Sequence, residues 1–371
     1  MSSCTDQLQT CLQSWNNRDE VYSRLDTFLD VVLDDREVHG ETKLIKIKST
    51  FTKRCFNKLK LLLQQAWSAR QFKRVATILQ IFHFLSNCQG RLHAGFDVFI
   101  KHGVVDILKD VWSDVVGECE IVGAKEGLSD VGCDIIDTLT GITDYSKKAK
   151  LLVVEKFLLS LVGTVLSKSV AKNFDLRTKM LHFIVGLLER CEGLHEMTRL
   201  LKTPGLLEQL ANVAMAIPHL GDIEHQLSMT EMLLLMTLDT PNRRQQLSCA
   251  FGNKNIQAKF MSISLDNLEE DALKFLLFLN NQRQAETSVM SYPCVEAAVA
   301  DCQLKCPYVD KSLGIIVHVN IGSKRILIFV KPSQLHRSWT HDRQMMSGLL
   351  AVTTMSVGNG TVLQARSAKT L

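Results

Sequence analysis

Ten basic residues and no acidic residue lie between Lys43 and Arg74, and this block is the clearest chemical signal in the chain. Cations on a helix can contact phosphate groups. Each contact adds affinity by releasing counterions, with a salt slope of about 0.9 per neutralised phosphate on duplex DNA. The block is therefore a candidate site for binding DNA or another partner. Its basic residues are Lys43, Lys46, Lys48, Lys53, Arg54, Lys58, Lys60, Arg70, Lys73 and Arg74.

An acidic stretch just upstream offers a second interpretation of this block. If the two stretches form neighbouring helices, their charges neutralise each other on a solvated outer face, where ion pairs contribute little to stability. Both interpretations remain open at the level of the sequence. The acidic residues are Asp19, Glu20, Asp26, Asp30, Asp34, Asp35, Glu37 and Glu41.

Three cysteines and one histidine near the C-terminal end come closest to a metal-binding pattern. Cys302 and Cys306 have the spacing of one half of a zinc site, with Cys294 before them and His318 after them. A zinc site normally needs a second ligand pair, and the sequence offers none. We therefore predict no metal site.

Motifs for catalysis are also missing. His195-Glu196 lacks the second histidine that a zinc protease helix requires. Gly358-Asn-Gly360 lacks the further glycine and the Lys-Ser/Thr pair of a phosphate loop, and the chain has no G-x-S-x-G elbow. We therefore expect no catalytic residues, no cofactor and no enzymatic activity. The alternative is a site assembled from residues distant in the sequence.

The composition is typical of a folded intracellular protein. The chain has 371 residues, 46% hydrophobic and 22% charged, which is enough for two domains. It shows no leader pattern and no run of about 20 apolar residues, so we expect no export and no membrane span. Eleven irregularly spaced cysteines favour a reducing compartment without disulfides. A net charge of +4 indicates neither nucleic acid nor membrane as a partner.

Helical patterns separated by glycine or proline fill most of the chain. Residues 70–87 are apolar around most of a helical circumference, which is typical of an inner helix. Gly103 is predicted to end a helix in the left-handed conformation. Inner helices recur at roughly 40 to 50 residues, which predicts an irregular armadillo- or HEAT-like α-solenoid, with a non-repetitive helical domain as the alternative. Further helices are predicted over 128–144, 147–168, 174–192, 205–217, 223–238 and 255–282, with breaks at Gly141, Gly193, Pro204, Pro218 and Pro241.

A strong β-hairpin pattern follows the helices at 313–330. Two β-branched runs flank the turn Asn320-Ile-Gly-Ser323, which we expect to need a positive φ. A lone hairpin is only marginally stable in water, so this one must pack on the helices or belong to a larger sheet. We therefore predict a mainly α protein that ends in a small β module. The predicted domains are a helical repeat domain over 1–288, an incomplete β module over 289–333 and a poorly ordered tail over 334–371.

Several stretches resemble one known family in their residues and in their order along the chain. They are Glu231-Met-Leu-Leu-Leu-Met-Thr237, Asn242-Arg-Arg-Gln-Gln-Leu247, the helix from Asp271 to Asn281, Tyr292-Pro-Cys294 and the turn Asn320-Ile-Gly-Ser323. These stretches resemble the N-terminal part of the synaptonemal complex protein 2 family, which includes the synaptonemal complex protein 2-like paralogue. The resemblance is clear over 220–330, while the earlier helices agree mainly in pattern.

The resemblance implies an armadillo-like domain joined to a pleckstrin-homology-like domain. It also implies a nuclear protein of the meiotic chromosome axis, the lateral element of the synaptonemal complex, which binds centromeric, other chromosomal or other axis proteins. The similarity stops after Val330 and no heptad run is sustained, so we expect the family's coiled-coil assembly region to be absent from this chain. The alternatives are a generic armadillo scaffold that binds extended peptides and direct DNA binding through the basic block.

Overall fold

The chain forms two compact units, Met1–Leu206 and Leu207–Leu371. The computed structural model describes residues 8, 11–12, 18–39, 53–87, 99–121, 127–189, 203, 205–238, 241–283, 288–299, 302–305, 315–323, 325–330, 350–352 and 363–367. Within these stretches, none of the helices combines the length and the apolar character needed to cross a lipid bilayer.

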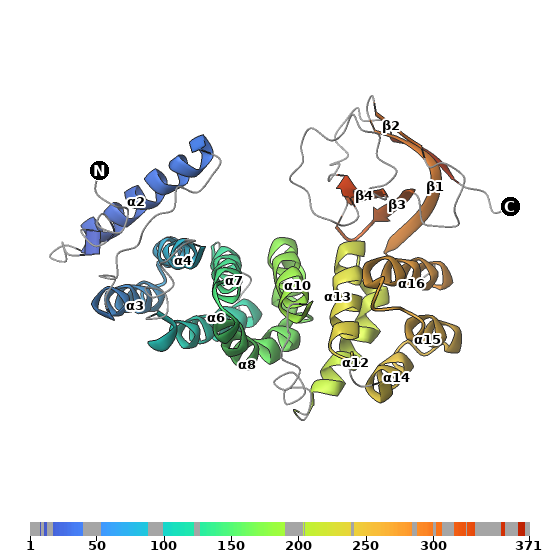
Figure 1. Ribbon diagram of the computed structural model, residues 1–371, viewed down its shortest axis with the longest axis horizontal. Helices are drawn as coiled ribbons and strands as arrows, with labels where there is room; N and C mark the ends of the chain where they lie inside the picture. The colour runs from blue at the N-terminus through green and yellow to red at the C-terminus, as the bar shows by residue number, and fades with distance from the viewer. Residues whose placement is uncertain are drawn as a thin grey trace. The chain divides into compact units, whose positions relative to one another are not determined.

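The first unit is built from helices in two layers (Figure 1). Its described helices are α2 (Arg18–His39), α3 (Lys53–Ser68), α4 (Phe72–Asn87), α6 (Val104–Ile121), α7 (Leu128–Tyr145), α8 (Lys147–Thr164), α9 (Lys168–Lys172) and α10 (Phe174–Glu189). One layer contains α4, α7 and α10, and α7 packs against both of its neighbours. The other layer contains α3, α6 and α8, with α6 between its neighbours. α2 packs on α4.

The predicted inner helix at 70–87 is confirmed as α4. Its apolar side chains are buried on several sides of the helix, and Val75, Ile78 and Phe82 are fully inaccessible. The predicted helix end at Gly103 is also confirmed, because this glycine has a φ of 85° directly before α6. A residue in the left-handed conformation at this position lets the last carbonyl groups of one helix accept hydrogen bonds and turns the chain toward the next helix.

Two predicted helix limits are wrong. Gly141 does not break a helix but lies buried inside α7, and the break comes at Ser146. The Ser146 hydroxyl accepts a hydrogen bond from the Ala149 N–H at 3.1 Å, which starts α8 as an N-cap does. The stretch 255–282 forms two helices instead of one. The loop between them is held by the Asp271 carboxylate, which accepts the Ser264 N–H at 3.1 Å.

The second unit begins with short helices around a buried central helix. They are α12 (Leu206–Ala216), the 3₁₀ helix η1 (Ile217–His219), α13 (Ile223–Leu235), α14 (Pro241–Cys249), α15 (Lys254–Met261) and α16 (Leu268–Gln282). Pro241, predicted as a break, is the first residue of α14, where the missing N–H of proline costs nothing. The buried Gln226 of α13 exchanges two side-chain hydrogen bonds with Asn280 of α16, at 3.2 and 2.9 Å. This pair joins the two helices inside the core.

An antiparallel sheet completes the second unit. Its strands are β1 (Val289–Val299), β2 (Cys302–Lys305), β3 (Ile315–Asn320), β4 (Arg325–Val330), β5 (Leu350–Val352) and β6 (Leu363–Ser367), in the order β2-β1-β3-β4-β5 with β6 also paired to β1. The predicted hairpin is confirmed, because β3 pairs with β4 from Ile315↔Val330 to Asn320↔Arg325. It belongs to a larger sheet, and α16 packs against β1.

A mainly α fold followed by a small β module is thus confirmed. β5 and β6 lie within 334–371, where the sequence predicts a poorly ordered tail, and they pair with β4 and β1. The other residues of that tail lie outside the described stretches. The predicted domain limits, the solenoid type and the pleckstrin-homology-like type stay predictions.

Candidate interaction site

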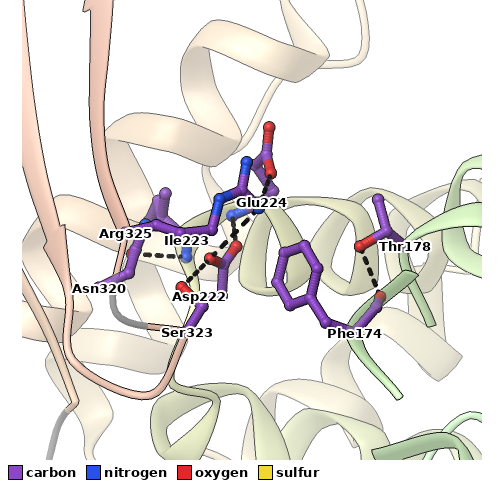
Figure 2. A network of polar contacts seen from close by, with 8 residues as sticks. All are labelled: Phe174, Thr178, Asp222, Ile223, Glu224, Asn320, Ser323 and Arg325. Atoms are coloured by element: carbon purple, nitrogen blue, oxygen red, sulfur yellow. Dashed lines mark hydrogen bonds and ion pairs between the residues drawn. The ribbon is translucent and has the colours of Figure 1, made fainter. Parts of the chain in front are cut away.

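The N-terminus of α13 meets the turn between β3 and β4 in a network of polar contacts (Figure 2). We call this network the helix–hairpin joint. Asp222 is the N-cap of α13, and its Oδ1 accepts the N–H of Glu224 at 2.9 Å. The sequence favours this cap because aspartate directly before an apolar helical pattern satisfies N–H groups that have no partner within the helix.

The hairpin supplies the remaining contacts at the start of α13. Asn320 Oδ1 accepts the N–H of Ile223 at 3.0 Å, so a side chain 97 residues away satisfies the first helical N–H. The Ser323 hydroxyl donates to Asp222 Oδ2 at 2.6 Å, and the Ser323 N–H donates to the Gly221 carbonyl at 3.3 Å. The hairpin therefore satisfies an N–H at the start of α13, and Gly221 and Asp222 accept hydrogen bonds from the hairpin in return.

Arg325 adds charge to the helix–hairpin joint. Its Nη1 lies 3.0 Å from Glu224 Oε2 and 3.9 Å from Asp222 Oδ2. The Asp222 side chain is only 3% exposed and that of Arg325 only 18%. Ion pairs removed from water in this way are screened little by salt, and losing one partner leaves a buried charge. The ion pairs of the joint should consequently depend little on ionic strength.

Two glycines let the backbones approach closely at the helix–hairpin joint. A Cβ on Gly322 would lie 2.5 Å from the Cα of Gly221, and a Cβ on Gly221 would lie 2.5 Å from the Cα of Gly322. The expected positive φ in the hairpin turn is wrong for the described turn positions 321–323, none of which has one. Gly322 is required by the contact with Gly221 instead.

The basic block from Lys43 to Arg74 is only partly described. Lys43, Lys46 and Lys48 lie outside the described stretches. Lys53 and Arg54 begin α3, but their side chains are outside the description.

Three other members of the block contact neighbouring groups. Lys58 Nζ donates to the Leu12 carbonyl at 2.6 Å. The Arg70 guanidinium lies over the Trp67 ring at 5.2 Å, and that of Arg74 lies over the Tyr22 ring at 4.6 Å. Lys73 is exposed and Lys60 is half-exposed. Binding of a partner by this block stays a prediction.

No group of three potential metal ligands is found among the described residues. The side chains of Cys294, Cys302 and Cys306 lie outside the description, while His318 is fully buried and shares a 2.8 Å hydrogen bond with Ser291 through Nδ1. Burial lowers the pKa of His318 to about 3, so its imidazole is neutral at physiological pH.

Comparison with known proteins finds synaptonemal complex proteins that are similar to this chain in sequence. It is 24% identical to mouse synaptonemal complex protein 2 over 72% of its length, and 26% identical to mouse synaptonemal complex protein 2-like over 53%. Human synaptonemal complex protein 2 is 23% identical over 80% of the chain. The chain is thus similar in sequence to proteins of the synaptonemal complex protein 2 family. The chain spans about a fifth of the length of these relatives, at 18%, 23% and 19% respectively.

A solved structure titled "Synaptonemal complex protein" shares the fold of this chain. The TM-score is 0.62 at 24% identity, covering 81% of the chain and 79% of that structure. No family model matches the sequence. The stretch Asn320-Ile-Gly-Ser323, one of those that carry the resemblance seen in the sequence, forms the turn of the helix–hairpin joint and joins sheet to helix.

The sequence does not reveal the helix–hairpin joint. Asp222 could be identified as an N-cap, because it precedes the helical pattern that begins at Ile223. Nothing in the spacing shows that Ser323 would contact Asp222 or that Arg325 would contact Glu224, since each pair is separated by 101 residues.

Proposed function

We propose that this chain is a nuclear component of the meiotic chromosome axis that acts by binding other axis proteins or centromeric and other chromosomal proteins. The observation that supports this most is the similarity to synaptonemal complex proteins over most of the chain. Synaptonemal complex proteins are named for the assembly to which they belong, which suits a binding role without catalysis. The helical first unit and the joined helices and sheet of the second unit offer rigid surfaces for such binding.

The finer architecture belongs to the same proposal. We propose that α4, α7 and α10 form the inner layer of an armadillo-like solenoid, which is supported by their side-by-side packing over the layer of α3, α6 and α8. We propose further that the sheet belongs to a pleckstrin-homology-like domain. A solenoid layer of this kind suits a protein partner because it presents parallel helices at regular intervals.

Localisation in meiotic cells tests the proposed function. A tagged copy of the full chain should form continuous lines on spread meiotic chromosomes that coincide with an axis marker. Proteins recovered with it from meiotic nuclei should include axis or centromere components that remain bound at high salt. A tag spread evenly through the nucleus or confined to the cytoplasm would contradict the proposal.

Direct DNA binding by the basic block is a second candidate function. It is supported by the absence of acidic residues between Lys43 and Arg74 and by the exposure of Lys73 and Lys60. The variant K60E/K73E should weaken duplex binding and lower the slope of log affinity against log salt by about 1.8, or 0.9 for each lost contact.

The matched control for this experiment is K101E/K109E, which reverses two exposed lysines elsewhere in the first unit. This variant should retain the affinity and salt slope of the original chain. Equal slopes for K60E/K73E and the original chain would remove the basic block as a DNA site.

A further inference from the structure

One face of the sheet carries an apolar row across the neighbouring strands β1, β3 and β4. Residues that are paired in antiparallel strands lie on the same face of the sheet. Met290 on β1 is paired with Val319 on β3, and Val319 is paired with Ile326 on β4. Met290 is 39% exposed, and the other two side chains are half-exposed. An apolar row thus reaches the surface on three strands.

The apolar surface continues along the strands on both sides of this row. Tyr292, two residues after Met290, is 44% exposed. Ile321, two residues after Val319, is 53% exposed, and its N–H donates to the Ser288 carbonyl at 2.8 Å, which continues the pairing of β3 with β1. Residues two apart in a strand point to the same side, so both side chains join the row. We call this surface the sheet patch, and it consists of Met290, Tyr292, Val319, Ile321 and Ile326.

The opposite face of the same strands is buried. Ser291 on β1, His318 on β3 and Leu327 on β4 are paired with one another and point to that face. The sheet therefore has one covered face and one face with large apolar side chains at the surface. Soluble proteins seldom expose several neighbouring apolar side chains, and such patches commonly mark binding surfaces.

The composition and size of the sheet patch limit what can bind to it. None of its five side chains is charged, so it offers no cation to the phosphates of nucleic acid or to the anionic headgroups of a membrane. A second copy of this chain is also a poor fit, because stable interfaces between folded proteins use about 20 to 30 residues a side. A short apolar segment of another protein matches a patch of this size.

The geometry of the sheet patch favours a helical segment. β3 is paired with β1 on one side and with β4 on the other, so a peptide cannot add beside it as a further strand. Neighbouring strands lie about 4.8 Å apart, so three strands span about 10 Å, which is the diameter of a helix. Side chains two apart on a strand are separated by about 7 Å, close to the 5–6 Å between positions i and i+4 of a helix.

We propose that the sheet patch binds an amphipathic helix of a partner protein through apolar side chains spaced three and four residues apart. Tyr292 and Ile321 are its most exposed members and provide the main contacts. The Tyr292 hydroxyl donates to the Met290 sulfur at 3.3 Å, which links the two exposed side chains of β1. The inference goes beyond the proposed function, because it assigns one binding surface and the form of its partner without depending on where the protein lies in the cell.

Selection from a displayed peptide library tests this proposal. The library consists of amphipathic helices of about 16 residues with randomised apolar positions, and the full chain is the target. Selected peptides should keep apolar residues at i, i+3, i+4 and i+7. Their affinity, measured by fluorescence anisotropy, should fall at least about tenfold for Y292S/I321S, because burying one large apolar side chain already contributes about that factor. If circular dichroism shows that the double variant is misfolded, Ile321→Ser alone, at the exposed turn, should lower the affinity in the same direction.

The matched control is L61S/M215S, which removes two side chains of similar exposure, 43% and 49%, from α3 and α12. It should bind the selected peptides as tightly as the original chain does. Failure to select helical peptides, or equal affinity for the original chain and the patch variants, would overturn the proposal. So would a dimer of the original chain that Y292S/I321S abolishes, because the patch would then bind a second copy. Axis localisation is a separate measurement, so the proposed function and this inference can fail independently.

Discussion

His318 is a neutral imidazole buried in the sheet of the second unit, where loss of water disfavours its charged form. Its side chain is fully buried, it shares a hydrogen bond with Ser291 on β1, and it is paired with Leu327 on β4. Because burial lowers its pKa to about 3, the unfolded chain takes up a proton at a higher pH than the folded chain does. Neutral His318 therefore makes its full contribution to the free energy of unfolding above the ordinary pKa of histidine, near 6.5. This contribution is lost as the pH falls from there through 3.

We predict that His318→Asn makes the second unit less sensitive to acid. Asparagine can keep a hydrogen bond near the position of Nδ1 but does not titrate, so less stability should be lost between pH 6 and pH 4. The smaller side chain should cost about 1 to 3 kcal/mol at neutral pH, because it leaves space in the core. Chemical denaturation at several pH values checks both effects.

A histidine in a different environment provides the control for this substitution. His182 is exposed on α10, so His182→Asn should leave the pH dependence unchanged. If His318→Asn and the original chain lost stability equally on acidification, neutral burial of His318 would not be the source of acid sensitivity.

At the scale of elements, the close approach of Gly221 and Gly322 fixes the distance between α13 and the hairpin. We predict that Gly322→Ala destabilises the second unit by about 1 to 3 kcal/mol, because the new Cβ meets backbone atoms that cannot rotate away. Thermal unfolding of the full chain measures the change.

Gly186→Ala is the matched control for the glycine substitution. Gly186 lies inside α10, and a Cβ there meets nothing within 4 Å. This change should stabilise the first unit by about 0.5 to 1 kcal/mol, since alanine favours a helix more than glycine does. A Gly322→Ala variant as stable as the original chain would mean that the helix–hairpin joint adjusts without cost.

Local patterns predicted individual elements well and their mutual contacts poorly. The hairpin at 313–330 was predictable because alternating β-branched residues and a turn lie within one short stretch. The predicted break at Gly141 failed, since burial of neighbouring Ile142 keeps α7 continuous. The role of Gly322 was not predictable, because the reason for a glycine there lies at Gly221, about a hundred residues earlier in the chain.

At the scale of the whole molecule, the compact units divide at 206/207, whereas the predicted change from helices to strands falls at 288/289. Helices and sheet belong to one unit because α16 packs on β1 and the helix–hairpin joint ties α13 to β3 and β4. Glycine and proline mark where elements end, but they do not indicate which elements share a core. The order of the elements could therefore be predicted from local patterns, whereas their packing partners could not.

The long separation between the partners of the helix–hairpin joint also sets an order of events during protein synthesis. The helices of the first unit make contacts within a short span of chain and can pack while translation continues, whereas contacts between distant residues form late. α13 emerges from the ribosome about a hundred residues before Ser323 and Arg325, which complete its N-terminus. Until then, Asp222 remains a hydrated carboxylate. In a chain that stops after α16, the second unit has α12 to α16, but α13 still lacks its partners from the hairpin. The turn at Gly322 therefore marks the point from which a nascent chain can begin to join the sheet to α13.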